Sequence, residues 1–135
     1  MTDETQAAAI NVASENPKDA CGKLKPGIRS IPPIAIIEEG IVMQDGADKY
    51  GPFNWQDAPI RASIFYDAMF RHMVQWYTGE NVDPESKAGG LHLAAIRASA
   101  GILIDAHAKG TLIDDRPKTT SNASEAIGRL TAKRN

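Results

Sequence analysis

The stretch from residue 32 to residue 83 limits the fold of this chain most strongly, because two segments with helical patterns enclose a short loop there. The first segment begins at Pro33, a residue favoured in the first helical turn, and we expect it to end at Gly46. The second segment follows Pro59 and runs from Ile60 to Tyr77. Loops held between packed helices often carry functional side chains, so this stretch is the first place to look for a site.

A third helical pattern runs from about Leu91 to Ala108 and ends at Gly110. Small residues dominate its middle, which lets another helix approach closely. A short helix is expected from Ala123 to Lys133, with Asn122 as its cap. The chain has no alternating strand pattern of useful length, so we expect an all-α bundle of about three long helices. The helix from Pro33 is apolar on nearly every side, and we expect self-association to cover its surplus apolar surface.

The 135 residues predict one folded domain with a segment on either side of it. Residues 1–31 are expected to form an N-terminal arm, because proline and glycine interrupt them too often for a long helix. The arm is expected to lie over the helical core or a neighbouring subunit. The domain is expected to cover residues 32–117, and residues 118–135 to form a polar tail or a short helix.

Composition removes several classes of function. The net charge is −2 and no basic block occurs, so there is no electrostatic signature of nucleic-acid binding. Cys21 is the only cysteine, which excludes an internal disulfide and a cysteine zinc site within one chain. No apolar run reaches the roughly 18 residues of a membrane helix, and the first residues do not resemble a signal peptide. We therefore expect a cytoplasmic protein that binds neither nucleic acid nor membrane.

Glu38 is the first candidate for chemistry. It has Ile34 one helical turn before it and Val42 one turn after it, so it lies on an apolar stripe where an unpaired charge would cost roughly several kcal/mol. An ion pair with Lys49 or Arg71, or a partly exposed position, would compensate the charge. The functional alternative is ligation of a hard divalent cation, which requires further carboxylates nearby.

Glu80 and Asp83 are the carboxylates that could complete such a metal site. Acidic pairs at helix ends are also common as capping residues, so this spacing alone is a weak signal. Asp67 and Arg71 are spaced for an ion pair on a helix surface, and Asp67 is also a candidate third ligand.

The loop residues suggest a nucleotide. Lys49 beside Tyr50, Asn54 and Trp55 offers a phosphate contact, stacking faces and an amide that could read a base edge. Packing in the core would explain Trp55 equally well.

The two histidines nearest these residues, His72 and His92, lie in apolar surroundings, where a lone histidine is more often a satisfied core residue than a ligand. The common nucleotide-binding loops and the H-E-x-x-H zinc motif are absent.

These residues combine into a family resemblance. The order that carries it is Pro32-Pro33, Glu38, Gly46-Ala47-Asp48-Lys49-Tyr50-Gly51, Asn54-Trp55, Tyr66-Asp67-Ala68, Arg71-His72, Gly79-Glu80, Asp83-Pro84-Glu85-Ser86 and His92. From about Asp19 to Pro117 the chain resembles the dATP/dGTP diphosphohydrolase family of phages, which is related to the MazG-like, all-α nucleoside triphosphate pyrophosphohydrolases. Within that family it is most similar to the MazZ type, which is associated with phages that replace adenine by 2-aminoadenine and need dGMP as a precursor.

The resemblance implies a MazG-like helical bundle completed by homo-oligomerisation, as a dimer or tetramer. It implies cleavage of a purine (deoxy)nucleoside triphosphate, most simply (d)GTP, to the monophosphate and pyrophosphate in the cytoplasm of a phage-infected cell. Two or more Mg²⁺ or Mn²⁺ ions are expected per site. The implied metal ligands are Glu38, Glu80, Asp83 and Asp67. The implied catalytic residues are Glu38, Glu80, Lys49 and Arg71, and the implied substrate contacts are Lys49, Tyr50, Asn54, Trp55, Arg71, His72 and His92.

The sequence departs from the family pattern at two points. MazG-like proteins carry E-x-x-E on the first metal-binding helix, whereas Ala35 and Ile41 flank Glu38 at that spacing here. The family also tends to have a second histidine where this chain has Ala95. Three alternatives remain: a histidine-aspartate phosphohydrolase, which is disfavoured because the chain has no His-Asp dipeptide, a noncatalytic helical nucleotide-binding or assembly module, and hydrolysis of dATP and dGTP without preference for guanine.

Overall fold

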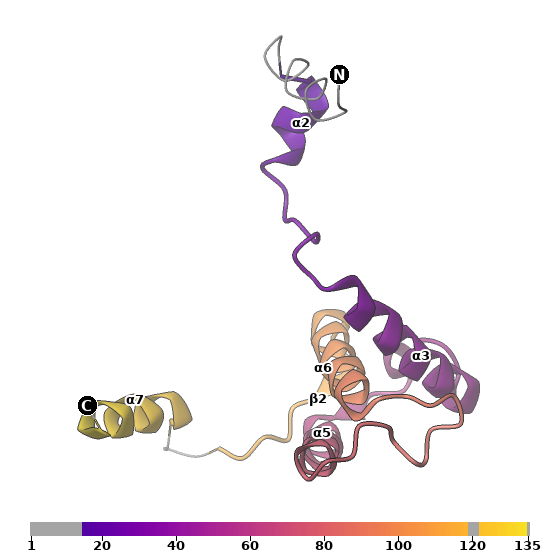
Figure 1. The fold of residues 1–135 in the computed structure, drawn as a ribbon, viewed down its shortest axis with the longest axis vertical. Helices are drawn as coiled ribbons and strands as arrows, with labels where there is room; N and C mark the ends of the chain where they lie inside the picture. The colour runs from indigo at the N-terminus through magenta and orange to yellow at the C-terminus, as the bar shows by residue number, and fades with distance from the viewer. Residues whose placement is uncertain (1–14, 119–121, 135) are drawn as a thin grey trace. The chain divides into compact units, whose positions relative to one another are not determined.

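The computed structural model describes residues 15–118 and 122–134, and these residues form a mainly helical protein (Figure 1). The prediction of an all-α fold is confirmed. The helices are α2 (Pro17–Gly22), α3 (Pro33–Tyr50), α4 (Asn54–Asp57), α5 (Ala62–Tyr77), α6 (His92–Lys109) and α7 (Ala123–Arg134). Two short strands, β1 (Ile60–Arg61) and β2 (Leu112–Ile113), accompany them. None of the helices in the described residues is long and apolar enough to cross a membrane.

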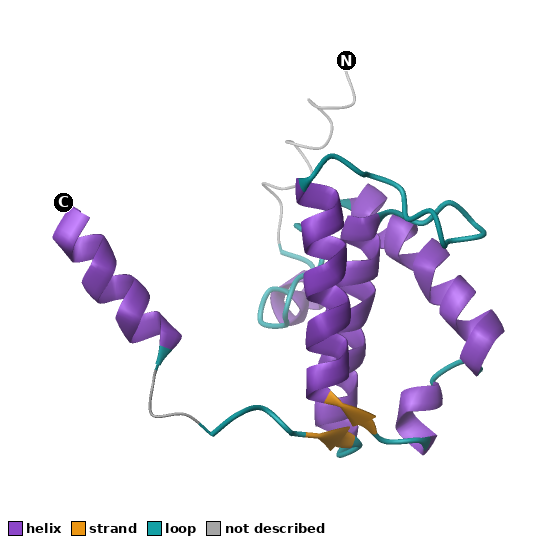
Figure 2. Ribbon diagram, turned by 90° about the horizontal axis from the view of Figure 1, so that it is seen from below, coloured by secondary structure: helices purple, strands orange, loops and turns teal. Residues whose placement is uncertain are grey.

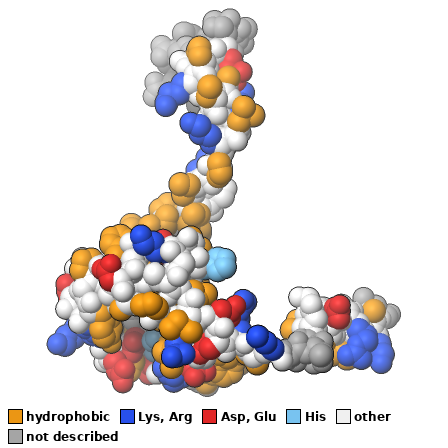
Figure 3. Space-filling view, turned by 180° about the vertical axis from the view of Figure 1, so that it is seen from behind, with side chains coloured by type: hydrophobic (Ala, Val, Ile, Leu, Met, Phe, Trp, Pro, Cys, Tyr) orange, Lys and Arg blue, Asp and Glu red, His pale blue; other side chains and the backbone are white. Residues whose placement is uncertain are grey.

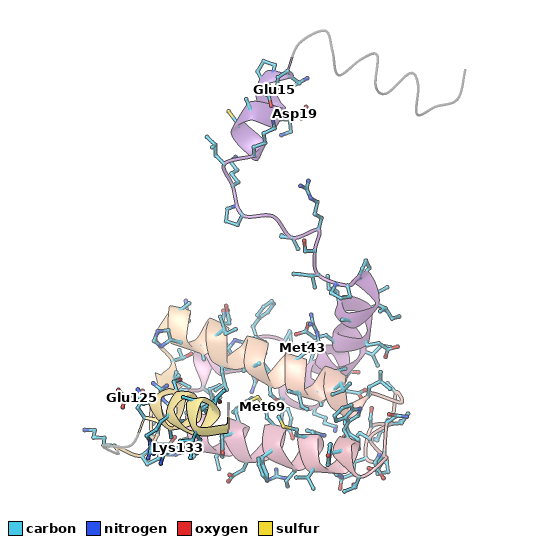
Figure 4. The ribbon with its side chains drawn as sticks, turned by 60° about the vertical axis from the view of Figure 1, so that its left-hand side comes forward. Glu15, Asp19, Met43, Met69, Glu125 and Lys133 are labelled. Carbon is cyan, nitrogen blue, oxygen red and sulfur yellow. The ribbon has the colours of Figure 1, made fainter. Side chains whose placement is uncertain are left out.

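The chain divides into two compact units, Met1–Ile36 and Ile37–Asn135. In the first unit, the described residues contain α2, whose N-terminus is capped by the Asn16 side chain accepting a hydrogen bond from the Lys18 amide at 2.8 Å. Glu15 and Asp19 project from this segment (Figure 4). Leu24 and Ile28 of the same unit are exposed. The predicted contact of this arm with a helical core or a second subunit stays a prediction.

Helices α5 and α6 form the centre of the second unit. They pack antiparallel, and Met69 of α5 lies on the side of that helix that faces α6 (Figure 4). The buried residues of α6 are mostly alanines, namely Ala94, Ala95, Ala98 and Ala106, together with His92. Short side chains let the two backbones approach closely, as the alanine-rich pattern predicted.

Backbone hydrogen bonds join α5 and α6 at both ends. At one end β1 precedes α5, β2 follows α6, and the two strands pair in parallel with Ile60 opposite Leu112 (Figure 2). At the other end Val82 and Leu91 form an antiparallel bridge, and the His92 amide donates to the Asn81 carbonyl at 3.0 Å. Backbone hydrogen bonds therefore hold α5 and α6 together at each end of the helix pair.

Two predicted boundaries are wrong. Helix α3 does not end at Gly46 but continues to Tyr50, and it stops where Gly51 adopts a φ of 88°. An L-residue disfavours that conformation, which explains why glycine ends the helix there. The predicted loop around Tyr50 and Trp55 is consequently short, since α4 already begins at Asn54. Helix α5 likewise begins at Ala62, because the two residues before it pair with β2.

Trp55 joins α4 to α6. Its ring is only 7% exposed, and its Nε1–H donates to the Asp105 carboxylate at 2.6 Å. Gln56 donates to the same oxygen at 2.8 Å. These two hydrogen bonds lower the pKa of Asp105, and the bond from Gln56 contributes more than the bond from Trp55. This geometry agrees with the packing account of Trp55 that the sequence left open.

The lowered pKa of Asp105 predicts an acid-dependent stability. A carboxylate whose folded pKa lies below its unfolded value stabilises the fold above the unfolded pKa, and that contribution is lost as the pH falls through the folded pKa. We expect the unfolding temperature of Asp105→Asn to fall less than that of the wild type as the pH is lowered from neutral to strongly acidic. Thermal unfolding at a series of pH values measures this difference. Asp114, whose pKa is lowered to about 2 by Arg116, should keep its own acid dependence in that variant. Identical pH curves for wild type and Asp105→Asn would contradict the assignment.

Large apolar side chains remain exposed on the second unit. On α5 they include Ile64, Tyr66, Phe70, Met73, Val74, Trp76 and Tyr77, whereas the buried core consists of Trp55 and small alanines. Hydrophobic side chains are visible across the helical region in Figure 3. Several large apolar side chains exposed on one helix are typical of an interaction surface.

Candidate functional site

A cavity of about 720 Å³ opens beside α3, α5 and the loop that leads into α6. Its size lies within the usual range for small-molecule sites. Lys49 and Tyr50 reach it from the last turn of α3, and Arg71 and His72 reach it from α5. Three carboxylates, those of Asp45, Asp83 and Glu85, also line it. The cavity therefore combines two cations with three carboxylates.

The loop that carries Asp83 and Glu85 is held by its own hydrogen bonds. The Asp83 amide donates to the Gly90 carbonyl at 2.8 Å, and the Glu85 amide donates to the Asp83 carboxylate at 2.9 Å. The Ser86 hydroxyl donates to Asp45 of α3 at 2.8 Å and accepts from the Gly90 amide at 2.8 Å. These contacts fix the carboxylates of the loop against α3.

Gly90 has no room for a side chain. A Cβ atom at this position would lie 2.9 Å from Ser86 Oγ and 3.0 Å from a methyl group of Val42, both closer than ordinary contacts. The absence of a side chain is therefore what allows α3 and the loop to close around the carboxylates.

Two histidines meet at the edge of the cavity. His92 is fully buried; its Nε2 lies 2.7 Å from Glu80 Oε1 and its Nδ1 lies 2.8 Å from His72 Nδ1. Burial is the main cause that lowers the pKa of His72, and the nearby Asp83 opposes it. The lowered pKa favours the neutral form of His72.

The comparison with protein families gave one match. The model for the dATP/dGTP diphosphohydrolase N-terminal domain matches residues 15–116, which contain the whole cavity and both histidines. The chain belongs to the dATP/dGTP diphosphohydrolase family. Members of this family are nucleoside triphosphate hydrolases, so the protein is an enzyme of that class. Neither the curated proteins nor the solved structures gave a match.

The diphosphohydrolase cavity contains five of the residues predicted from the sequence: Lys49, Tyr50, Arg71, His72 and Asp83. The other predicted residues lie outside its lining: Glu38, Asn54, Trp55, Asp67, Glu80 and His92. Their predicted roles stay predictions. The Glu80 carboxylate is hydrogen-bonded to His92 and does not line the cavity.

The predicted metal ligands do not converge within one chain. In the part of the chain that the structure describes, the group of metal-ligating side chains that comes together is His72, Asp83 and His92, with none of Glu38, Glu80 or Asp67 in it. The departure from the E-x-x-E pattern is consistent with this result. Glu39, the neighbour of Glu38, forms an ion pair with Arg97 of α6 at 3.3 Å.

Among the cavity residues that were given no role from the sequence, three carry a carboxylate or an amide: Asp45, Glu85 and Gln75. Asp45 lies two helical turns after Glu38, so helical periodicity could have identified it as a carboxylate on the same side of α3. Glu85 lies inside the Asp83-Pro84-Glu85-Ser86 motif, where only Asp83 was given a role. Gln75 lies one turn after Arg71 on α5, and the same periodicity could have identified it.

Proposed function

We propose that the protein hydrolyses dGTP, in preference to dATP, to dGMP and pyrophosphate with the help of Mg²⁺ or Mn²⁺. In this reaction the oxygen of a water molecule forms a bond to the α-phosphorus. The bond from the α-phosphorus to the bridging oxygen breaks, pyrophosphate leaves, and the water releases a proton. The observation that carries the proposal is the cavity in which Lys49 and Arg71 lie together with three carboxylates.

The carboxylates of the cavity suit hard divalent ions. Asp45, Asp83 and Glu85 would supply oxygen ligands, which Mg²⁺ and Mn²⁺ prefer over nitrogen or sulfur. Asp45 and Glu85 are not in the group whose ligand atoms lie within 4.8 Å of one another, so each ion would be held by one or two carboxylates together with the phosphates of the substrate. Such ions, when bound, neutralise phosphate charge and lower the pKa of a water molecule. Two or more ions per site are part of the proposal. The hydrogen bond from Ser86 holds Asp45 in place for this role.

The positively charged side chains of the cavity would attract the negatively charged phosphates. Lys49 and Arg71 would bind the triphosphate and stabilise the charge that grows on the leaving pyrophosphate. Phosphoryl transfer depends mainly on positioning and on such preorganised charges.

The base would lie against the aromatic side of the cavity. Tyr50 is 72% exposed and lines the cavity together with Phe70, so both offer a stacking surface. Gln75 lines the same cavity and carries an amide donor and an amide acceptor, which fit the O6 and N1–H of guanine. Because an amide also fits the edge of adenine, the proposed preference for guanine rests on the family resemblance. Asn54, the amide proposed from the sequence, is not in the lining. We therefore assign base reading to Gln75.

A comparison of substrates tests the proposed preference. We expect dGTP to give the highest kcat/KM among the eight common (deoxy)nucleoside triphosphates, with dGMP and pyrophosphate as products. Gln75→Ala should reduce the ratio of dGTP to dATP use, because the guanine edge loses its partner. Asn54→Ala serves as the matched amide control and should keep the ratio. Equal use of both purines by wild type would contradict the guanine preference.

The exposed apolar residues of α5 support a homo-oligomer, either a dimer or a tetramer. Residues of α5 outside the cavity, such as Tyr66, Met73 and Tyr77, would be covered by a second copy, because surfaces of this kind are unfavourable in water. We expect light scattering to give at least twice the mass of one chain at micromolar concentration. Met73→Glu, outside the cavity lining, should shift the protein toward the monomer, and Lys87→Glu, a change at an exposed loop residue, should not. A wild-type monomer would contradict the proposal.

The proposed reaction fits a role in the nucleotide pool of a phage-infected cell. It would remove dGTP and supply dGMP, the precursor for DNA that contains 2-aminoadenine. The site would then act in the cytoplasm of the host.

A further inference from the structure

Three side chains with metal-binding atoms meet at the edge of the cavity. They are His72 on α5, Asp83 in the following loop and His92 at the start of α6. One ligand atom from each residue lies within 4.8 Å of the other two. Among the residues that the structure describes, this is the group of at least three His, Cys, Asp or Glu side chains that comes this close.

Glu80 sets the tautomer of His92. Its carboxylate lies 2.7 Å from His92 Nε2, and a carboxylate accepts hydrogen bonds, so the ring proton of neutral His92 is on Nε2. The lone pair of His92 is therefore on Nδ1 and points toward His72 Nδ1, 2.8 Å away. A carboxylate that holds a histidine in this way is typical of metal-binding histidines, where it orients the ring and increases its basicity.

A metal ion can join all three side chains, whereas a proton joins only two of them. His92 is fully buried, and its ring nitrogens face Glu80 and His72 instead of water. The Asp83 carboxylate lies close to the two histidines and accepts a hydrogen bond from the Glu85 amide at 2.9 Å. A proton shared by the two Nδ1 atoms leaves Asp83 out, whereas a cation among the three side chains can bind one atom of each.

We infer that His72, Asp83 and His92 bind one first-row divalent transition-metal ion of the Mn²⁺, Fe²⁺ or Co²⁺ type. Glu80 orients His92 without binding the ion. Two imidazoles and one carboxylate can occupy one face of a metal ion and leave its other coordination positions open. His72 and Asp83 also line the cavity, so those positions face the space where a substrate would lie.

The two nitrogens are close enough for one ion to bind both. They lie 2.8 Å apart in a hydrogen bond, and two metal–nitrogen bonds of about 2.1 Å would span that distance. An ion with three protein ligands would keep further positions for water or phosphate oxygens.

This site differs in chemistry from the magnesium site proposed above. Imidazole nitrogens favour first-row transition metals, whereas Mg²⁺ prefers oxygen ligands throughout. Asp83 belongs to both sets. The inference rests on the contacts of these residues and not on the proposed reaction, except for the statement that phosphate oxygens occupy the open positions.

Binding of Co²⁺ to the full-length protein, freed of metal with a chelator, tests the inference without any nucleotide. We expect a bound Co²⁺ ion per chain that a hundredfold excess of Mg²⁺ does not displace, measured by equilibrium dialysis. The bound ion should also produce strongly shifted proton NMR signals from imidazole N–H groups. The signal of the His92 N–H, which is buried against Glu80, should exchange slowly with solvent.

Three variants make the test specific. His72→Gln should weaken Co²⁺ binding by about 100-fold or more and remove shifted imidazole signals, and Glu80→Gln should weaken it by about 10- to 100-fold. His107→Gln removes the third histidine, which is exposed near the end of α6, and should change nothing. Circular dichroism checks folding, and Glu80→Gln decides the result if His72→Gln does not fold.

Two results would overturn the inference: unchanged Co²⁺ affinity in the folded variants, or displacement of Co²⁺ by an equal concentration of Mg²⁺. The histidine pair would then be an ordinary hydrogen bond. Failure of the proposed function looks different, because a folded protein would bind Co²⁺ as expected yet release no pyrophosphate from any nucleotide.

Discussion

Asp83→Asn is expected to reduce pyrophosphate release by about 100-fold or more at saturating dGTP and Mg²⁺. Asp83 lines the cavity, and the proposed reaction requires its negative charge to hold a divalent ion beside the triphosphate. Removing a single preorganised charged or polar contact in an active site commonly lowers kcat by about 10²–10³. The variant should keep its fold, because asparagine retains a side-chain oxygen. That oxygen can accept the hydrogen bond that the Glu85 amide donates to Asp83 at 2.9 Å.

The matched control is Asp57→Asn, an identical chemical change at an exposed position of α4 outside the cavity. It should leave turnover within about twofold of wild type, since exposed charges contribute little. Thermal unfolding of both variants separates loss of structure from loss of chemistry. Full activity in Asp83→Asn would remove this carboxylate from the mechanism.

Arg71→Ala is expected to lower kcat/KM for dGTP by about 10²–10³, because a cation that stabilises the leaving phosphates is lost. Arg71 comes from α5 and Lys49 from the end of α3, so the two cations enter the cavity from different helices. Lys49→Ala should therefore have an effect of its own. Arg71→Lys should recover only part of the rate, because lysine keeps the charge but lacks the planar fork that pairs with phosphate oxygens.

Lys109→Ala controls for the loss of a positive charge. Lys109 is exposed in the last turn of α6 and outside the cavity, so its replacement should leave kcat/KM close to wild type. Steady-state kinetics with dGTP at constant ionic strength compares the four variants. A wild-type rate in Arg71→Ala would show that the guanidinium does not touch the reacting phosphates.

Local signals predicted the long helices well. The alanine-rich pattern and the terminating Gly110 predicted the bounds of α6 almost as observed, because helix periodicity and helix capping depend on residues close together in the sequence. The end of α3 was mispredicted because a single glycine inside a helix costs only about 1 kcal/mol, so Gly46 could be accommodated by the packing of its neighbours. The β1–β2 pair joins residues about fifty positions apart, and no local pattern in two residues predicts it.

The same distinction applies to the site. Lys49, Tyr50 and Arg71 were predicted from short motifs and lie in the cavity. The contact between His72 and His92 was not predicted, because it exists only when α5 and α6 pack antiparallel and bring residues from two helices to one place. The apolar surroundings of each histidine favoured a core residue and the family resemblance implied a substrate contact, whereas neither predicted that the two side chains meet.

The hydrogen bonds at both ends of the α5–α6 pair decide which element can move when a ligand enters. Separating α5 from α6 would break the β1–β2 pairing at one end or the Val82–Leu91 bridge at the other. Helix α3 has no such backbone pairing with the α5–α6 pair in the described residues. Its side-chain contacts include the hydrogen bonds that Asp45 accepts from Ser86, in the loop before α6, and that Glu39 accepts from Arg97 of α6. Backbone pairing therefore holds the α5–α6 pair together, whereas the side of the cavity that α3 supplies is joined to the loop before α6 by the side-chain hydrogen bond from Ser86 to Asp45.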